Sequence, residues 1–161
     1  MEEDPSGVGV FLRFQAEKQA ARHVFPIGTV TDISRFTCCA RYEPFWMKPH
    51  AGTKAGQVPV ETQYLLTEQE GGACVLYVPL IDGAFRGSLQ GAGEDGLELV
   101  AESGDPATMT DQIVGLFVAS GDDPYALLEQ AARSVMAHLG TGRLRTEKPL
   151  PAFADKFGWC T

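Results

Sequence analysis

The chain has 161 residues, of which 44% are hydrophobic, and a formal net charge of −8 at pH 7. This length suits one domain with a sizeable core, or one domain and part of another. The acidic balance argues against nucleic acids and anionic membrane surfaces, which select basic patches, and suits a neutral ligand. The N-terminal MEEDPSGVGV lacks the pattern of a secretory signal, and the apolar run ACVLYVPLI is far shorter than the roughly 20 residues of a membrane span. We therefore expect a cytoplasmic location and no membrane partner.

Most of the chain has the pattern of consecutive β-strands. Segments rich in Val, Phe and Ile, or alternating apolar with polar residues, are separated by turn residues every eight to twelve positions. The predicted strands cover residues 8–16, 22–30, 35–46, 58–69, 74–81, 85–92, 96–103 and 111–120. In 35–46, Phe36, Cys38, Ala40 and Tyr42 share one face. This regular punctuation predicts a mainly β fold over residues 1–121, an antiparallel β-sandwich or barrel.

One helix follows the strands, in the segment 122–140. Asp123 is placed to cap it, Pro124 takes the first helical position, and Gly140 stands where a left-handed C-cap belongs. An apolar stripe runs along it: Leu127, Leu128, Ala131, Val135 and Leu139. Residues 141–154 are charged, contain two prolines and show no period, which predicts a linker. The segment 155–161, which ends in the apolar FGWCT, then resembles the start of a buried strand.

The residues that could carry chemistry show no catalytic or metal-binding pattern. His23, His50 and His138 have no metal-ligand spacing, and the four cysteines include no C-x-x-C pair, so we expect no metal and no cofactor. Buried free thiols are the favoured interpretation of Cys38, Cys39, Cys74 and Cys160. The candidate carboxylates form no recognisable acid–base pair, and no catalytic residue is assigned among them: Glu61, Asp82, Glu102, Asp122 and Asp123.

The aromatic segment RYEPFWMKPHAGTKAG, residues 41–56, is the most suggestive. It places Tyr42, Phe45, Trp46 and Met47 at a strand end, before a loop with Gly and Lys. An aromatic face beside polar groups suits binding of a sugar ring. The alternative is that Phe45 and Trp46 are core residues at the end of a strand.

Several motifs, in order, resemble one family. The terminal DKFGWCT is similar to the start of a Phe-Gly-Trp-Cys-Thr-Trp-Asp-Ala-Phe signature in the raffinose synthase/seed imbibition protein family, relatives of the family 36 α-galactosidases. Further matches lie upstream: RHVFPIG, RFTCCARYEPFWM, PVETQYLL, VPLIDGAFRGSLQG, ESGDP, GDDPYALL and HLGTGRLRTEKPLP. The resemblance covers the chain from about residue 8. One difference is that the family tract commonly has paired tryptophans and an arginine where this chain has Phe45-Trp46 and KPHAG.

The resemblance implies an N-terminal β-sandwich followed by a catalytic (β/α)8 barrel, whose first strand would begin within 155–161. It implies an N-terminal fragment of a retaining galactosyltransferase that makes raffinose from galactinol and sucrose, without the catalytic aspartates and inactive alone. Trp46 would contact the sugar, as would Trp159 in the signature. Galactinol, sucrose and other α-galactosides would be the small-molecule partners. Two alternatives stay open: an alkaline α-galactosidase fragment, or a non-catalytic carbohydrate-binding β-sandwich. The oligomeric state stays undetermined.

Overall fold

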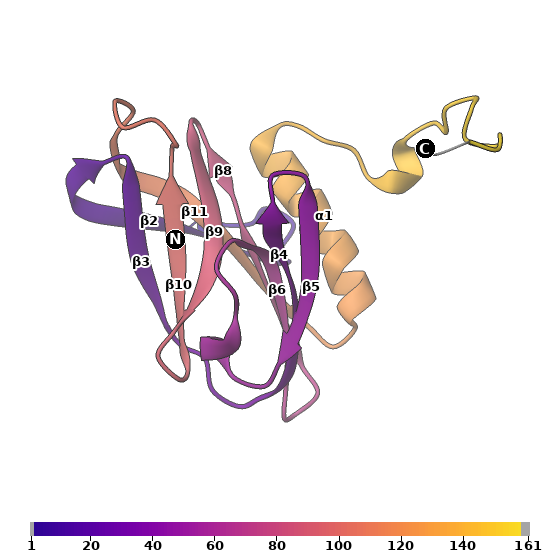
Figure 1. Cartoon of the computed structure of the whole chain (residues 1–161). Coiled ribbons are helices and arrows are strands. Elements are labelled where there is room, and N and C mark those ends of the chain that lie inside the picture. The colour runs from indigo at the N-terminus through magenta and orange to yellow at the C-terminus, as the bar shows by residue number, and fades with distance from the viewer. Residues whose placement is uncertain (1, 159–161) are drawn as a thin grey trace.

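The computed structural model describes residues 2–158 and consists of antiparallel strands, one long helix and two short 3-10 helices (Figure 1). The strands are β1 (Glu2–Glu3), β2 (Gly9–Ala20), β3 (Arg22–Thr29), β4 (Ile33–Glu43), β5 (Trp46–Gly52), β6 (Thr62–Gln69), β7 (Cys74–Pro79), β8 (Ile81–Asp82), β9 (Phe85–Ala92), β10 (Gly96–Glu102) and β11 (Thr110–Gly121). The helices are η1 (Ala55–Gln57), α1 (Pro124–Leu139) and η2 (Arg145–Glu147). The predicted mainly β fold with one C-terminal helix is confirmed.

The strands form one hydrogen-bonded network that curls into two layers. One layer has the order β1-β2-β11-β7-β6-β4-β5, and the other has the order β3-β10-β9, with β8 paired to β9. The layers are joined where β6 pairs with β9 at a single position, Thr62 opposite Leu89. The sandwich is therefore nearly a closed barrel, which leaves few free strand edges.

The main core lies between the two layers. Side chains from both are fully buried there, among them Phe36, Leu65, Leu89, Leu99 and Leu116. A second cluster lies under α1, on the outer face of β2, β11 and β7. It contains Phe11, Leu76, Phe117, Leu127 and Ala131.

The helix begins and ends as the sequence predicts. Asp123 accepts hydrogen bonds from the backbone N–H of Tyr125 at 2.8 Å and of Ala126 at 3.2 Å, and Gly140 ends the helix with a φ of 63°. Of the predicted stripe, Leu127 and Ala131 are buried, whereas Leu128 and Leu139 are partly exposed at the helix margins.

Two strand predictions were wrong in detail. The predicted strand 35–46 ends at Glu43. Residues 46–52, which the prediction divided between the end of that strand and the following loop, form the separate strand β5. Phe36, Cys38 and Ala40 share the predicted buried face, but the register shifts beside Tyr42, which is exposed. The predicted strand 58–69 begins only at Thr62, because Glu61 has a left-handed backbone with a φ of 61° and cannot continue an extended strand.

The N-terminal segment is fastened to α1 by a buried carboxylate. Asp4 is only 6% exposed and accepts hydrogen bonds from Ser134 Oγ at 2.7 Å, from Ser6 Oγ, and from the backbone N–H of Ser6 at 3.2 Å and Val8 at 3.3 Å. Desolvation acts to raise the pKa of Asp4, but these hydrogen bonds together outweigh it, so the pKa lies below its ordinary value. His138 stacks on Phe11 beside this contact, with ring centroids 4.0 Å apart.

Asp4→Asn is expected to destabilise the protein at pH 7 by about 1.5 to 3 kcal/mol, the range for hydrogen bonds to a charged group. A carboxyl whose pKa is depressed by folding adds stability above its unfolded pKa and loses it as the pH falls through the folded value. The free energy of unfolding in urea should therefore differ less between wild type and Asp4→Asn once the pH falls below about 3.9, the pKa of an unfolded Asp. Asp155→Asn, at an exposed position, is the control. An equal difference in the free energy of unfolding at pH 7 and at pH 2.5 would contradict the prediction.

Beyond α1 the described chain leaves the sandwich. Residues 151–158 are exposed and lie in no strand, with Phe153 74% exposed and Phe157 fully exposed. Figure 1 shows this segment extending away from the end of α1. The described residues of the predicted barrel start, 155–158, therefore lie outside the sheet; Cys160 and the rest of that segment lie outside the described residues.

Deleting residues 152–161 is expected to change the thermal midpoint by no more than about 2 °C, because exposed segments contribute roughly 0.5 kcal/mol or less. Solubility should improve, since exposed apolar side chains are removed. Differential scanning calorimetry of the two forms would measure the shift. A fall of many degrees would mean that the segment is an integral part of the folded unit.

Candidate functional site

The candidate site is the hairpin formed by β4 and β5. Its turn is Glu43-Pro44-Phe45-Trp46, where Pro44 suits the second position of a β-turn because its ring fixes φ near −65°. The register shift beside Tyr42 adds twist to the two strands at the turn. The hairpin therefore carries its aromatic residues beyond the sheet.

Large apolar side chains are exposed at the tip of this hairpin. Tyr42 is 68% exposed, Phe45 94%, Trp46 71% and Met47 45%. Lys48 Nζ lies 4.8 Å from the centre of the Tyr42 ring, a cation–π contact. A shallow hollow of about 440 Å³ lies among Tyr42, Glu43, Trp46, Met47 and Lys48. It combines an aromatic face with charged groups, which are the elements that recognise a sugar ring.

The hairpin tip lies at the same end of the sandwich as the C-terminal end of α1 (Figure 1). Because β6 and β7 are antiparallel, with Leu65 opposite Tyr77, the last residues of β7 and the following β8 also lie at this end of the sandwich. A second hollow is lined by β8 and by residues from the C-terminal end of α1. Further exposed apolar residues lie at this end: Val60, Ile81, Met109 and Leu139. We call it the hairpin end. Exposed apolar side chains gathered on one face are typical of a contact surface.

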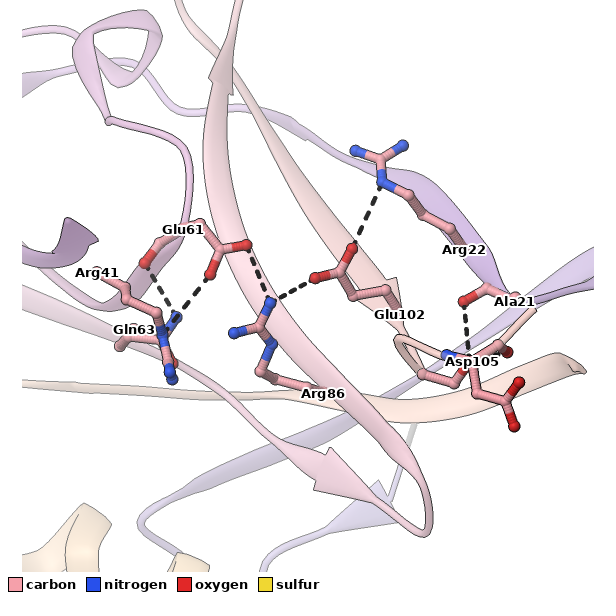
Figure 2. Close-up of polar contacts among 9 residues, drawn as sticks. Ala21, Arg22, Arg41, Glu61, Gln63, Arg86, Glu102 and Asp105 are labelled. Atoms are coloured by element: carbon pink, nitrogen blue, oxygen red, sulfur yellow. Dashed lines mark hydrogen bonds and ion pairs between the residues drawn. The ribbon is translucent and has the colours of Figure 1, made fainter. Parts of the chain in front are cut away.

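A chain of ion pairs crosses the hairpin end. Arg86 Nη2 donates to Glu61 Oε1 at 3.1 Å and also to Glu102 Oε1 (Figure 2). The chain continues from Glu102 Oε2 to Arg22 Nε, and from Glu61 Oε2 to Arg41 Nε, each over 3.8 Å. These contacts link β3, β10 and β9 of one layer to β4 of the other.

Within this series of ion pairs, Glu61 is the residue that contacts both layers, through Arg41 on β4 and Arg86 on β9. Its backbone carbonyl accepts from the N–H of Arg41 at 3.0 Å and from Gln63 Nε2 at 2.9 Å. A left-handed conformation costs a non-glycine residue about 1 to 2 kcal/mol, so these contacts offset a local strain.

Sequence reasoning assigned Trp46 and Trp159 to sugar binding. Trp46 is exposed at the hairpin tip, so the alternative that Phe45 and Trp46 belong to the core is wrong. Trp159 lies outside the described residues. The strand formed by residues 46–52 was not predicted, because Pro49 and Gly52 within it are typical of a loop and its exposed residues show no alternating pattern.

Four of the five candidate carboxylates have structural partners. Asp82 accepts from the backbone N–H of Val114 at 2.8 Å and Asp123 caps α1, while Glu61 and Glu102 both pair with Arg86. Among the described residues, no group of three or more His, Cys, Asp or Glu side chains could hold a metal ion.

The described cysteines Cys38, Cys39 and Cys74 are free thiols, as predicted, but only Cys38 and Cys74 are buried. Burial raises the pKa of both buried thiols, so they stay protonated at neutral pH. No helix in the described part of the chain is long and apolar enough to cross a membrane.

Comparison with known families agrees with the resemblance in the sequence. The family described as raffinose synthase or seed imbibition protein Sip1 matches residues 3–161. The chain belongs to this family. A galactinol–sucrose galactosyltransferase of Oryza sativa subsp. japonica is 38% identical over 167 residues, covering 97% of this chain and 21% of the relative.

Two further members of the raffinose synthase family show the same relation. A probable galactinol–sucrose galactosyltransferase 6 of Arabidopsis thaliana is 37% identical, covering 95% of this chain and 23% of the relative. A stachyose synthase of Pisum sativum is 30% identical, covering 95% of this chain and 18% of the relative. The chain spans about a fifth of the length of these curated relatives.

Proposed function

We propose that this region is the β-sandwich of a galactosyltransferase that transfers galactose from galactinol to sucrose, and that its hairpin end faces the catalytic domain. The observation that carries the proposal is the exposed aromatic hairpin, at the end of the sandwich from which residues 141–158 depart. The relatives named above as galactinol–sucrose galactosyltransferases support the reaction.

Within this proposal, Trp46 contacts the sugar. Its indole face offers apolar area for the C–H face of a pyranose, and Lys48 and Glu43 beside it supply a donor and an acceptor for hydroxyl groups. The bonds made and broken would lie in the catalytic domain. One carboxylate would attack the anomeric carbon while a general acid protonates the departing oxygen of the donor, which breaks the glycosidic bond. The acceptor hydroxyl would then give its proton to that same residue and displace the carboxylate to take the galactosyl group. Trp159, in the signature at residues 155–161, would lie in that domain.

The described free thiols favour a reducing compartment, so we place the protein in the cytoplasm as part of the proposal. Water in place of sucrose as acceptor would make the same scaffold an α-galactosidase. Assaying with and without sucrose distinguishes the two reactions.

The test is a domain exchange. Residues 1–161 replace the matching region of the Oryza sativa relative, and galactinol consumption and raffinose formation are measured for this hybrid and for its Trp46→Ala variant. Activity that survives the exchange and depends on Trp46 supports the proposal. A correctly folded hybrid whose activity does not respond to Trp46→Ala would refute the sugar-contacting role.

A further inference from the structure

The aromatic hairpin is supported mainly at its base. Among the described strands β5 pairs only with β4, so it is an edge strand, and its residues are exposed apart from the half-buried His50 and Gly52. β4 in turn pairs with β6 as far as Ala40 opposite Thr62. Beyond this pair, the Arg41 N–H donates to the Glu61 carbonyl at 3.0 Å. The direction of the tip therefore depends on how residues 41 and 61 are held.

Glu61 holds Arg41 through both its backbone and its side chain. Its carboxylate lies between two guanidinium groups, with Oε1 3.1 Å from Arg86 and Oε2 3.8 Å from Arg41. Arg86 belongs to β9 in the opposite layer, and it is itself held by Glu102. The carboxylate thus joins the base of the hairpin to a strand of the other layer (Figure 2).

The backbone of Glu61 is also fixed. Thr62 Oγ1 donates to the Pro59 carbonyl at 2.8 Å, which closes a turn around Glu61, and Gln63 donates to the Glu61 carbonyl. A left-handed residue at this point turns the chain sharply from residues 58–60 into β6. The carboxylate is therefore presented from a rigid support.

The contact between Glu61 and Arg41 is incomplete. Arg41 Nε and Glu61 Oε2 are buried atoms that make no hydrogen bond in the described part of the chain, although they face each other at 3.8 Å. A hydrogen bond of about 2.9 Å would need a shift of roughly 1 Å at the base of the hairpin. The two charges attract each other across this gap, so the carboxylate draws the hairpin toward the other layer.

We propose that Glu61 is a positioning residue: its carboxylate fixes the base of the β4–β5 hairpin against β9 and so sets the direction in which Trp46 is presented. The expected effect of Glu61 on activity rests on the proposed sugar-contacting role of Trp46. The restraint of the hairpin by Glu61 does not depend on that role. Glu61 is accordingly not assigned a role in bond making or breaking.

Glu61→Gln tests the restraint, because it keeps the size of the side chain and removes the charge that both arginines face. In hydrogen exchange of the 161-residue chain, we expect the amides of β4 and β5 near the turn to exchange about tenfold faster, with β10 unchanged. Glu68→Gln is the matched control, since Glu68 pairs with Arg35 at 2.6 Å across the same two strands, β6 and β4, at their other end. Unchanged exchange in the hairpin, or an equal rise throughout the sheet, would overturn the proposal.

A fluorescence signal reports on Trp46 directly. The chain has two tryptophans, so Trp159→Phe leaves Trp46 as the sole tryptophan emitter. In that background we expect Glu61→Gln to lower the steady-state anisotropy and Glu61→Asp, which keeps the charge, to restore part of it. If Glu61→Gln does not fold, Arg86→Gln decides, because it removes the guanidinium that holds the Glu61 carboxylate: an anisotropy and hairpin exchange equal to those of wild type would overturn the proposal.

The domain-exchange enzyme separates this inference from the proposed function. We expect Glu61→Gln to raise KM for galactinol about tenfold with a smaller change in kcat, and Glu68→Gln to change neither. If Trp46→Ala has no effect on activity, the proposed function fails while the exchange and anisotropy results still decide the restraint. If Trp46→Ala lowers activity but Glu61→Gln changes neither the hydrogen exchange of the hairpin nor the anisotropy of Trp46, only the positioning role of Glu61 fails.

Discussion

Replacing Trp46 with alanine in the domain-exchange enzyme is expected to lower kcat/KM for galactinol by about ten- to a hundredfold. A buried tryptophan contact at an interface is commonly worth 2 kcal/mol or more, and each 1.4 kcal/mol corresponds to a factor of ten. Trp46 is 71% exposed, so its ring area is free for a ligand and the substitution removes little packing from the sandwich. The loss should therefore appear in activity and leave the thermal midpoint nearly unchanged.

Two matched variants make the test specific. Phe45→Ala removes a neighbouring aromatic ring at the same turn, and we expect a smaller effect because Phe45 does not border the hollow that Trp46 lines. Trp46→Phe keeps an aromatic face and should retain a substantial part of the activity. Equal losses for Phe45→Ala and Trp46→Ala would indicate a general role of the turn in domain contact, with no specific sugar contact by Trp46.

The parts of the fold that follow from local rules could be predicted from the sequence. The helix depends on an N-cap, a first-turn proline, an apolar stripe and a C-cap glycine, and each of these signals lies within the helix itself. Strands such as β9 and β10 are bounded by Gly-containing turns and are read correctly from hydrophobicity. For these elements local sequence and tertiary structure agree.

The hairpin could not be predicted in the same way. β5 is an edge strand with exposed residues, so it has no buried face to produce an alternating pattern, and Pro49 within it is typical of a loop or an edge. Gly52, which resembles a loop residue, is required by packing: a Cβ there would lie 2.6 Å from the Phe36 ring. A contact between strands thus determined a residue that the sequence pattern assigns to a turn.

The series of ion pairs across the hairpin end could not be predicted from the sequence either. Arg22, Arg41, Glu61, Arg86 and Glu102 are spread over 81 positions and form no motif. They meet because β10 pairs with both β3 and β9, which places Glu102 opposite Arg22 and Arg86, and because the turn before β6 brings Glu61 to β4. Sequence reasoning identified Glu61 and Glu102 as candidate acids, whereas their arginine partners give them a structural role.

Phe117→Ala is expected to destabilise the protein by about 3 to 5 kcal/mol, the range for removing a fully buried aromatic side chain. Phe117 lies on β11 beneath α1, and its ring centroid is 4.8 Å from that of Phe11 on β2. Its loss would leave a cavity where the helix packs on the sheet. For a protein of this size the thermal midpoint should fall by roughly 6 to 20 °C.

Phe45→Ala is the control for this substitution as well, since it removes the same side chain from a position that is 94% exposed. We expect its midpoint to stay within about 2 °C of wild type. Because α1 precedes residues 141–158, loosening it in Phe117→Ala should also disturb the hairpin end, and hydrogen exchange should rise in α1 before it rises in β9 and β10. A midpoint for Phe117→Ala equal to that of Phe45→Ala would mean that α1 is not packed on β11 as the structure has it, and the placement of the hairpin end beside the departing chain would lose its support.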